Sequence, residues 1–267
     1  MPEFGKQILT VNGLSMVFGG LRALDRIDLD VRQGEVVALI GPNGAGKTTF
    51  FNCITGLYAP TEGDMLISPP RKDKNIRLNG LKPNLVTEQG LARTFQNIRL
   101  FQNMTVLENV MIGRHCRMSA GIAGAIFRNR ATRDEEQQVV EESYVILEKI
   151  GLAQYVNDFA KNLPYGAQRR LEIARAMATD PFILLLDEPA AGMNTRETEE
   201  LDDLIEKIRE MEGISILLIE HDMKLVMSIS DRIFVVDYGK KIAEGTPEKI
   251  KSDPEVIKAY LGEESDA

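Results

Sequence analysis

Hydrophobic and polar positions alternate near the start of the chain, with a period of two that indicates extended strands with one face in water. In residues 23–31 one side is apolar and the other carries Asp28 and Asp30. Residues 8–18 also read as a strand, with a break near Gly13. These segments predict antiparallel strands at the beginning of the fold.

Three later runs are apolar almost throughout, which is typical of parallel strands that are covered on both faces. They span residues 35–40, 182–187 and 214–219. Residues 232–236 and 240–243 flank an Asp-Tyr-Gly turn and predict a hairpin. The pattern therefore indicates an α/β protein in which a parallel sheet follows antiparallel strands.

Helical spacing of apolar residues marks most of the remaining chain. It is clearest at 196–211, where Leu201, Leu204, Ile205 and Ile208 follow the i, i+3, i+4, i+7 pattern. Helices are predicted at 48–55, 105–114, 132–150, 167–178 and 196–211, with two short ones near 247–251 and 254–261. A short strand is expected at 65–68, a solvated basic loop at 71–74 and a flexible, glycine-broken stretch at 119–126.

Composition narrows the class of protein. The 267 residues suit one large domain or one core with an appended lobe. A net charge of −8 opposes a protein whose main ligand is nucleic acid. No apolar run reaches the roughly 18–20 residues that span a bilayer, and the N-terminus lacks the apolar core of a signal peptide. Cys53 and Cys116 have no metal-ligand spacing and fit a reduced cytosolic compartment, with Cys53 as a core residue.

The segment 41–49 matches the phosphate-binding pattern G-x-x-x-x-G-K-[ST] between a predicted strand and a predicted helix. Such a turn points several backbone N–H groups at one anion, and the helix N-terminus adds partial positive charge. Lys47 is expected to reach the β- and γ-phosphates, and the Thr48 hydroxyl to ligate Mg²⁺. The residues expected around the phosphates are Asn43, Gly44, Ala45, Gly46, Lys47, Thr48 and Thr49. The sequence therefore predicts that this protein binds a nucleoside triphosphate.

Two carboxylates follow the apolar run 182–187 at its C-terminal end, where ligands of open α/β sheets bind. Asp187 is suited to hold Mg²⁺ beside Thr48, through water. Glu188, one residue later, is suited to orient the attacking water as general base. The alternative, a polar turn after a strand, is less consistent with the phosphate loop.

Three further residues are ambiguous by themselves. His221 follows the apolar run 214–219 by two residues. It either hydrogen-bonds the γ-phosphate and holds Glu188 in place, or is a surface turn residue. Gln96 either completes the Mg²⁺ shell or contacts the attacking water, or has neither role. Phe18 either stacks on an adenine ring or is a half-buried strand residue.

The motifs follow one another in an order that resembles the ATP-binding cassette (ABC) ATPases over nearly the whole chain. They are the phosphate loop, Gln96, Leu-Pro-Tyr-Gly-Ala-Gln at 163–168, Leu-Asp-Glu-Pro at 186–189 and Glu-His-Asp at 220–222. Residues 91–101, 163–173 and the tail 244–262 look more specifically like the nucleotide-binding subunits of branched-chain amino acid importers.

This resemblance implies a P-loop NTPase fold of the ABC type. It combines an antiparallel β subdomain, a parallel-sheet core and a helical subdomain within a single nucleotide-binding domain, 1–267. The helical lobe is expected at about 97–180, and a short C-terminal helical extension at 240–267.

The resemblance also assigns roles to residues that the spacing leaves open. It makes Phe18 the adenine-stacking residue, Gln96 the lid residue that senses Mg²⁺, and His221 the switch histidine. The catalytic set is then Glu188, His221 and Gln96, and the metal set is Thr48, Gln96 and Asp187. In the family signature, Leu-Ser-Gly-Gly-Gln, the Ser hydroxyl touches ATP bound by a second subunit, so Tyr165, Gly166, Ala167 and Gln168 are expected to contact nucleotide there.

Two positions depart from the family pattern. Pro164 replaces the signature Ser and has neither a hydroxyl nor an N–H, so we expect a weaker phosphate contact through the backbone from Gly166 onward. Asn194 stands where the family usually has Asp, and it keeps hydrogen bonding but loses a charge. Communication between the two nucleotide sites is the property that these changes would affect.

The function implied is that of an ATP-hydrolysing subunit of a membrane importer for amino acids, with branched-chain amino acids as the expected class. Uptake would be driven by ATP-dependent closure and opening of a dimer. Partners would be a second ABC ATPase, identical or homologous, the transmembrane permease subunits and, indirectly, a solute-binding protein. The chain would lie in the cytoplasm, peripheral on the inner face of the cell membrane. Ile98, Leu100 and Phe101 are candidates for permease docking, or else ordinary lobe core.

Other classes fit less well. A signalling GTPase needs an Asn-Lys-x-Asp motif, and the chain contains none. A chromosome or DNA-repair ATPase would carry a long coiled coil between phosphate loop and signature, and a translation factor of the superfamily usually has two cassettes. An ABC-type ATPase for another solute such as amides, or one outside transport, is the alternative that stays open.

Overall fold

The computed structural model describes residues 4–70, 74–117 and 130–264. Its first sheet is antiparallel, with strand order β2-β1-β4-β5. The strands are β1 (Gln7–Phe18), β2 (Leu21–Arg32), β4 (Glu62–Ile67) and β5 (Ile76–Arg77). The predicted break at Gly13 is confirmed, because the β1–β2 register shifts between Val11 and Leu14 and Gly13 has a φ of 58°.

The second sheet has the order β10-β9-β3-β8-β7-β6. Its strands are β3 (Val36–Ile40), β6 (Leu91–Arg93), β7 (Ile183–Asp187), β8 (Ser215–Ile219), β9 (Arg232–Asp237) and β10 (Lys240–Gly245). Neighbouring strands run parallel except for the β9–β10 hairpin. The predicted parallel core with an antiparallel hairpin is confirmed.

Every predicted helix within the described residues is present, with ends shifted by at most two or three residues. The helices are α1 (Lys47–Ile54), α2 (Pro83–Glu88), α3 (Val106–Arg114), α5 (Arg130–Ile150), α6 (Tyr165–Met177), α7 (Thr195–Glu212), α8 (Met223–Ile229), α9 (Pro247–Lys251) and α10 (Pro254–Glu264). Short 3-10 turns lie at His115–Arg117, Ala153–Tyr155 and Ala160–Asn162. The predicted flexible stretch 119–126 and residues 71–73 of the basic loop lie outside the described residues.

Sequence reasoning missed the elements β5, α2 and α8, because they are too short to show a period. β5 has two residues, α2 six and α8 seven. The helix α8 begins because the Asp222 side chain accepts hydrogen bonds from the N–H groups of Lys224 and Leu225. A local capping residue, rather than an apolar stripe, therefore defines this helix.

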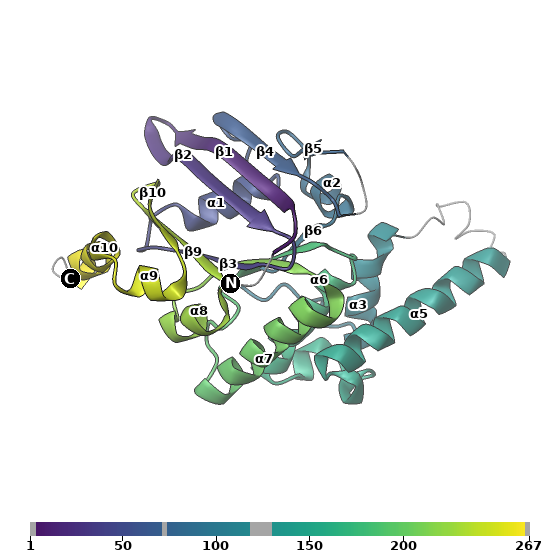
Figure 1. The fold of residues 1–267 in the computed structure, drawn as a ribbon. Helices are drawn as coiled ribbons and strands as arrows, with labels where there is room; N and C mark the ends of the chain where they lie inside the picture. Colours follow the sequence, from purple (N-terminus) through teal and green to yellow (C-terminus); the bar gives the residue numbers. More distant parts are fainter. Residues whose placement is uncertain (1–3, 71–73, 118–129, 265–267) are drawn as a thin grey trace.

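The parallel strands lie between two hydrophobic layers. In β3, Val36, Ala38 and Ile40 face the layer under α3, α5, α6 and α7, whereas Val37 and Leu39 face α1 and the antiparallel sheet. Figure 1 shows α1 between the two sheets, and its Cys53 is fully buried there. Burial raises the pKa of the Cys53 thiol to about 11. The interpretation of Cys53 as a core residue is confirmed.

Three helices form the end of the molecule that carries the predicted lobe. α3, α5 and α6 pack against one another, and Figure 1 shows α3 and α5 far from α9 and α10. α3 begins with a capping box, in which the side chains of Thr105 and Glu108 each accept the other's backbone N–H. The boundaries 97–180 and 240–267 stay a prediction.

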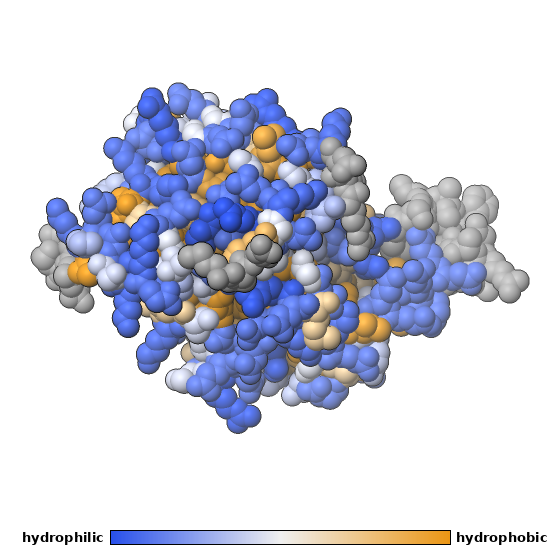
Figure 2. Space-filling view, in the orientation of Figure 1, coloured by the Kyte–Doolittle hydropathy of each residue, from blue (hydrophilic) through white to orange (hydrophobic). Residues whose placement is uncertain are grey.

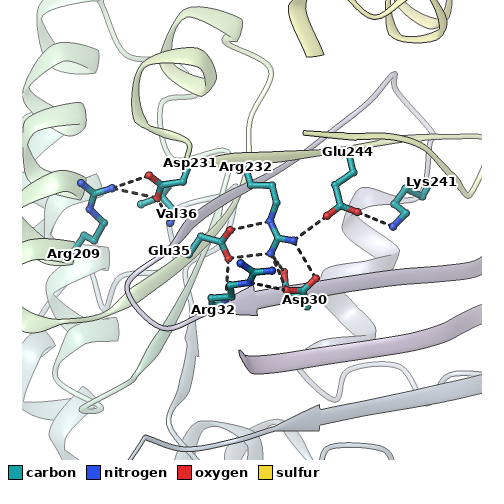
Figure 3. A network of polar contacts seen from close by, with 9 residues as sticks. All are labelled: Asp30, Arg32, Glu35, Val36, Arg209, Asp231, Arg232, Lys241 and Glu244. Atoms are coloured by element: carbon teal, nitrogen blue, oxygen red, sulfur yellow. Dashed lines mark hydrogen bonds and ion pairs between the residues drawn. The ribbon is translucent and has the colours of Figure 1, made fainter. Parts of the chain in front are cut away.

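A network of charges joins the two sheets (Figure 3). Arg232, at the start of β9, donates to Asp30 at 2.9 Å, to Glu35 at 2.8 Å and to Glu244 at 2.9 Å. These carboxylates come from β2, from the residue before β3 and from β10. Burial alone would raise the pKa of Asp30, but the hydrogen bond and charge of Arg232 outweigh it and lower that pKa. Arg232 therefore fixes the antiparallel sheet to the parallel core.

The surface drawn in Figure 2 is mostly hydrophilic. Outside the grey atoms, hydrophobic residues form small patches separated by charged and polar ones. Within residues 4–70, 74–117 and 130–264, no helix combines the length and the apolar character needed to cross a membrane.

We predict that Arg232→Met lowers the free energy of unfolding by about 3 kcal/mol, because three carboxylates lose their shared cation. For a chain of this size the midpoint of thermal unfolding should fall by roughly 6–12 °C. The folded pKa of Asp30 lies below its unfolded value, so this stabilisation is complete above the unfolded pKa and is lost as the pH falls through the folded pKa. The difference between parent and variant should therefore shrink at acid pH.

Calorimetry at several pH values measures both effects. Arg196→Met is the matched control, because that side chain is 87% exposed and pairs with Glu200 of the same helix. It should change stability by no more than about 0.5 kcal/mol. Equal stability of Arg232→Met and the parent would show that the network does not hold the sheets together.

Candidate active site

The phosphate loop, residues 41–46, joins β3 to α1. At two of its positions, 41 and 46, only glycine fits the surroundings. A Cβ on Gly41 would lie 1.9 Å from the carbonyl oxygen of Val236. A Cβ on Gly46, whose φ is 102°, would lie 2.6 Å from the carbonyl oxygen of Ala23. The loop is therefore pressed directly against the backbones of β9 and β2.

The turn between β9 and β10 braces the same loop. The N–H of Gly239 donates to the carbonyl of Ala45 at 3.1 Å, and the N–H of Asp25 donates to the carbonyl of Gly239 at 2.7 Å. One backbone turn thus connects the phosphate loop to the antiparallel sheet. The sequence marked this turn only as a hairpin and gave no signal of the contact.

Lys47 lies inside the loop that it was predicted to serve. Its side chain is buried, and Nζ donates to the carbonyl oxygens of Gly41 at 2.6 Å and Pro42 at 2.8 Å. Around it Asn43, Gly44 and Thr48 are exposed, Gly46 and Thr49 are half-buried and Ala45 is buried. A fixed ammonium group beside exposed loop residues suits a polyphosphate ligand.

Glu188, Gln96 and His221 come together although they are far apart in the sequence. The Gln96 amide donates to Glu188 Oε2 at 2.6 Å, and His221 Nε2 lies 2.9 Å from Glu188 Oε1. Glu188 has a φ of 47°, an unfavourable backbone conformation of the kind that gathers at functional sites. The three predicted catalytic residues therefore form one cluster at the ends of β7 and β8.

Asp187 has a partner that sequence reasoning missed. Arg93 donates to Asp187 Oδ2 at 2.6 Å, and both side chains are 6% exposed. The same guanidinium donates to the Asn52 side chain of α1 at 2.8 Å and lies 5.4 Å from the centre of the Phe51 ring. A charged residue in an otherwise buried strand, β6, was the available signal for this pair.

The predicted metal set fits Mg²⁺ by its chemistry. A threonine hydroxyl, a carboxylate and an amide are the hard oxygen donors that Mg²⁺ prefers. Among the described residues no cluster of three or more His, Cys, Asp or Glu side chains is suited to hold a metal ion.

Glu220, just before His221, was also missed as a site residue. It is buried, and it accepts hydrogen bonds from the N–H of Ala190 at 2.7 Å and of His221 at 3.0 Å. Burial raises the pKa of the Glu220 carboxyl, against the opposing effect of these N–H groups. It ties the loop after Glu188 to the loop that carries His221.

The predicted signature residues lie in the first turn of α6. Tyr165 is 43% exposed and its hydroxyl donates to the carbonyl of Ala191 at 2.9 Å. Gly166 and Ala167 are buried, and the Gln168 amide donates to the carbonyl of Leu163 at 2.9 Å. These two hydrogen bonds hold the segment to the start of its own helix and to the loop after Glu188.

The two departures from the family pattern have different local effects. In the described part of the chain no side chain caps α6, because Pro164 occupies the capping position. Asn194 caps α7 instead: its side chain accepts the N–H of Glu197 at 3.0 Å, and the Glu197 carboxylate accepts the N–H of Asn194 at 3.0 Å. Asn serves as well as Asp in this position.

Phe18 lies at the end of β1 and is 40% exposed. Its ring meets the ring of Tyr58 edge to face, with the centres 5.4 Å apart. Tyr58, which follows α1, was not singled out in the sequence. The pair leaves part of each ring in solvent, so both interpretations of Phe18 stay open.

A groove of about 420 Å³ lies beside the segment 93–101, which contains Gln96. Phe101 and Arg175 line it, together with Arg93 and Cys116. Of the three apolar residues considered for docking, Phe101 is 48% exposed, whereas Leu100 is buried and Ile98 packs on the core. The docking interpretation is therefore wrong for Leu100, whose side chain belongs to the hydrophobic layer under α6.

Comparison with known families agrees with this geometry. A model described as ABC transporter matches residues 24–191. A second, described as Branched-chain amino acid ATP-binding cassette transporter, matches residues 240–266.

Individual proteins are similar over almost the full length. The high-affinity branched-chain amino acid transport ATP-binding protein LivG of Escherichia coli K12 is 50% identical, covering 96% of this chain and 98% of its own. BraF of Pseudomonas aeruginosa PAO1, with the corresponding name, is 48% identical, covering 97% and 99%.

Two solved structures have the same fold. The ADP conformation of MJ1267, an ATP-binding cassette of an ABC transporter, superposes with a TM-score of 0.82 at 32% identity, covering 96% of this chain and 99% of that one. A dimeric post-hydrolysis state of the cassette MJ0796 bound to ADP and Pi gives 0.73 at 25% identity, covering 90% and 99%. The chain therefore belongs to the ABC transporter family, and it is an ATP-binding cassette that hydrolyses ATP.

Proposed function

We propose that this chain is the ATP-hydrolysing subunit of an importer for branched-chain amino acids. The single observation that carries hydrolysis is the convergence of Gln96 and His221 on Glu188, next in sequence to Asp187. The solute class is supported by the names of LivG and BraF and by the family match at residues 240–266.

ATP binding would use the phosphate loop. The backbone N–H groups of residues 43–49 and the Lys47 ammonium hold the phosphates, and Phe18 stacks on the adenine with Tyr58 behind it. Thr48, Asp187 and Gln96 would hold Mg²⁺, which supplies charge neutralisation for the transferred phosphoryl group.

Glu188 is the general base in this proposal. It aims the attacking water at the terminal phosphorus and takes its proton, while His221 and Gln96 hold the carboxylate from its two sides. His221 Nε2 lies 2.9 Å from Glu188 Oε1, so it can orient the carboxylate. Glu220 then fixes the backbone of His221 and of the loop after Glu188.

A second cassette would complete the nucleotide site. The dimeric structure of MJ0796 supports such an arrangement, and the resemblance favours a homologous, non-identical partner over an identical one. Tyr165, Gly166, Ala167 and Gln168 of one subunit would meet the ATP held by the other. Because those contacts exist only in the closed dimer, ATP favours closure and hydrolysis favours opening.

The groove beside Phe101 would receive a permease segment. It adjoins the Gln96 segment, so docking and the catalytic cluster share one stretch of chain, 93–101. In this proposal the chain would lie at the cytoplasmic face of the membrane, bound through its permease, and a solute-binding protein would act on the far side.

We predict that Lys47→Ala weakens ATP binding by roughly 10- to 150-fold, the value of a hydrogen bond to a charged group. The chain has no tryptophan, so a fluorescent ATP analogue is needed for the titration. Lys258→Ala on α10, an exposed lysine, is the control and should bind like the parent. Parent-like affinity of Lys47→Ala would exclude the proposed phosphate contact.

We predict that Glu188→Gln reduces turnover by about 10²–10⁴-fold and leaves ATP binding intact, because the amide cannot accept the proton of water. With ATP and Mg²⁺ the variant should accumulate as a dimer in size-exclusion chromatography. Glu199→Gln, an exposed change on α7, should behave as the parent. Undiminished turnover would exclude Glu188 as the base, and a purely monomeric variant would exclude self-association.

We predict that Phe101→Ser reduces co-purification of the permease from membranes by roughly ten-fold or more, because a half-exposed aromatic is the typical anchor of such a contact. ATP binding by the isolated chain should not change. Phe159→Ser is the control, since that ring is 46% exposed and does not line the groove. Equal permease recovery from both variants would place docking elsewhere.

A further inference from the structure

The first two turns of α6 carry a pair of side chains on one face. Tyr165 and Arg169 are four residues apart, which places them next to each other on a helix. The Arg169 guanidinium lies 5.9 Å from the centre of the Tyr165 ring. Arg169 is 2% exposed, so this pair connects the surface end of α6 with the interior.

Tyr165 reaches the loop that Glu188 begins. Its hydroxyl donates to the carbonyl of Ala191 at 2.9 Å. The N–H of Ala191 in turn donates to the carbonyl of Glu188 at 3.2 Å, closing a turn between them. A movement of Tyr165 therefore pulls on the turn that sets the backbone of Glu188.

Arg169 reaches the other neighbour of Glu188. It donates to the backbone carbonyl of Phe95 at 2.6 Å and to that of Gln96. It also donates to Glu172, at 3.2 Å, whose carboxylate accepts the N–H of Arg99 as well. The Gln96 side chain then donates to Glu188 Oε2 at 2.6 Å. The same helix thus holds Glu188 from two directions.

We propose that Tyr165 and Arg169 are positioning residues: through them, the signature segment of a chain, residues 163–168, sets the position of Glu188 in the same chain. The inference rests on the proposed function, in which α6 begins at the ATP of the second subunit. Contact with that ATP would fix the first turn of α6, and both side chains would carry the change to the catalytic cluster.

The proposed connection between α6 and Glu188 depends on two residues of this signature, Pro164 and Tyr165, that differ from the family pattern. The family pattern has glycine where Tyr165 stands, and glycine has no hydroxyl to bind Ala191. Pro164 offers no side-chain donor to the nucleotide, so contact must come through the backbone of α6 itself. A displacement of the α6 backbone on contact with nucleotide would move both Tyr165 and Arg169, because both belong to the first two turns of this helix.

Tyr165→Phe removes one hydroxyl and keeps the ring against Arg169. We expect turnover to fall between about two- and twelve-fold, the range of one neutral hydrogen bond. ATP affinity of the chain's own phosphate loop should stay as in the parent. The Hill coefficient of ATP hydrolysis should fall towards one, an effect that a merely structural hydroxyl would not produce. Tyr144→Phe on α5, a side chain exposed to a similar extent, is the matched control.

Two further variants separate the outcomes. Glu188→Gln combined with Tyr165→Phe should still dimerise with ATP. Loss of the dimer would mean that the Tyr165 hydroxyl is needed for dimer formation itself rather than for positioning Glu188, and would overturn the inference. Arg169→Lys keeps the charge but has all its donors on one nitrogen, so it cannot reproduce the fork in which Nη1 serves Phe95 and Glu172 and Nη2 serves Gln96. It should therefore lower cooperativity as Tyr165→Phe does. Thermal unfolding verifies that both variants fold.

Parent-like turnover and cooperativity of Tyr165→Phe and Arg169→Lys would overturn the inference and leave the proposed function intact. Absence of ATP hydrolysis by the parent chain, both alone and together with the homologous second cassette, would instead overturn the proposed function, and the inference with it.

Discussion

The phosphate loop keeps its shape because the backbones of two other elements close directly on its glycines. Carbonyl oxygens of β9 and β2 occupy the space where side chains at Gly41 and Gly46 would begin. The turn at Gly239 adds a hydrogen bond to the loop and another to β2. The nucleotide site is therefore inseparable from the junction of the two sheets, and the charges around Arg232 act on that same junction.

Three carboxylates at the C-terminal ends of β7 and β8 are stabilised in three different ways. Asp187 has a buried cation, Arg93. Glu188 has two side-chain partners, the Gln96 amide and the His221 imidazole. Glu220 accepts from backbone N–H groups, and its pKa is raised by burial. In the proposed function Glu188 is the base and must accept a proton; Gln96 and His221, the residues that hold it, are exposed.

Much of the fold could be predicted because it follows local periods. The alternation in β2, the continuous apolar run of β7 and the glycine pattern of the phosphate loop are each visible within about ten residues. Asp187 and Glu188 followed from their positions at a strand end, since parallel strands end at one edge of a sheet, whereas the role of His221 came only from the family resemblance. The short elements β5, α2 and α8 left no period to detect.

The contacts that sequence reasoning missed join distant segments through single side chains. Arg93 and Asp187 are 94 residues apart, and Tyr165 and Ala191 are 26 apart. No spacing rule predicts that a guanidinium or a hydroxyl will meet one particular oxygen at such a separation. The docking prediction for Leu100 was wrong for a related reason. An apolar residue beside Phe101 suits either a core or a docking surface, and only the packing in the folded chain distinguishes the two.

The start of α6 differs from the starts of α3 and α7 in a way that bears on the dimer. Both α3 and α7 satisfy their first N–H groups with their own side chains, through Thr105 and Asn194. α6 has Pro164 in that position and no side-chain cap among the described residues. N–H groups left without a cap need water or an anion, and the positive end of the helix favours the anion. Pro164 therefore supplies no hydroxyl, and the proposed nucleotide contact would have to use the N–H groups of this helix end, beside which the Glu197 carboxylate lies.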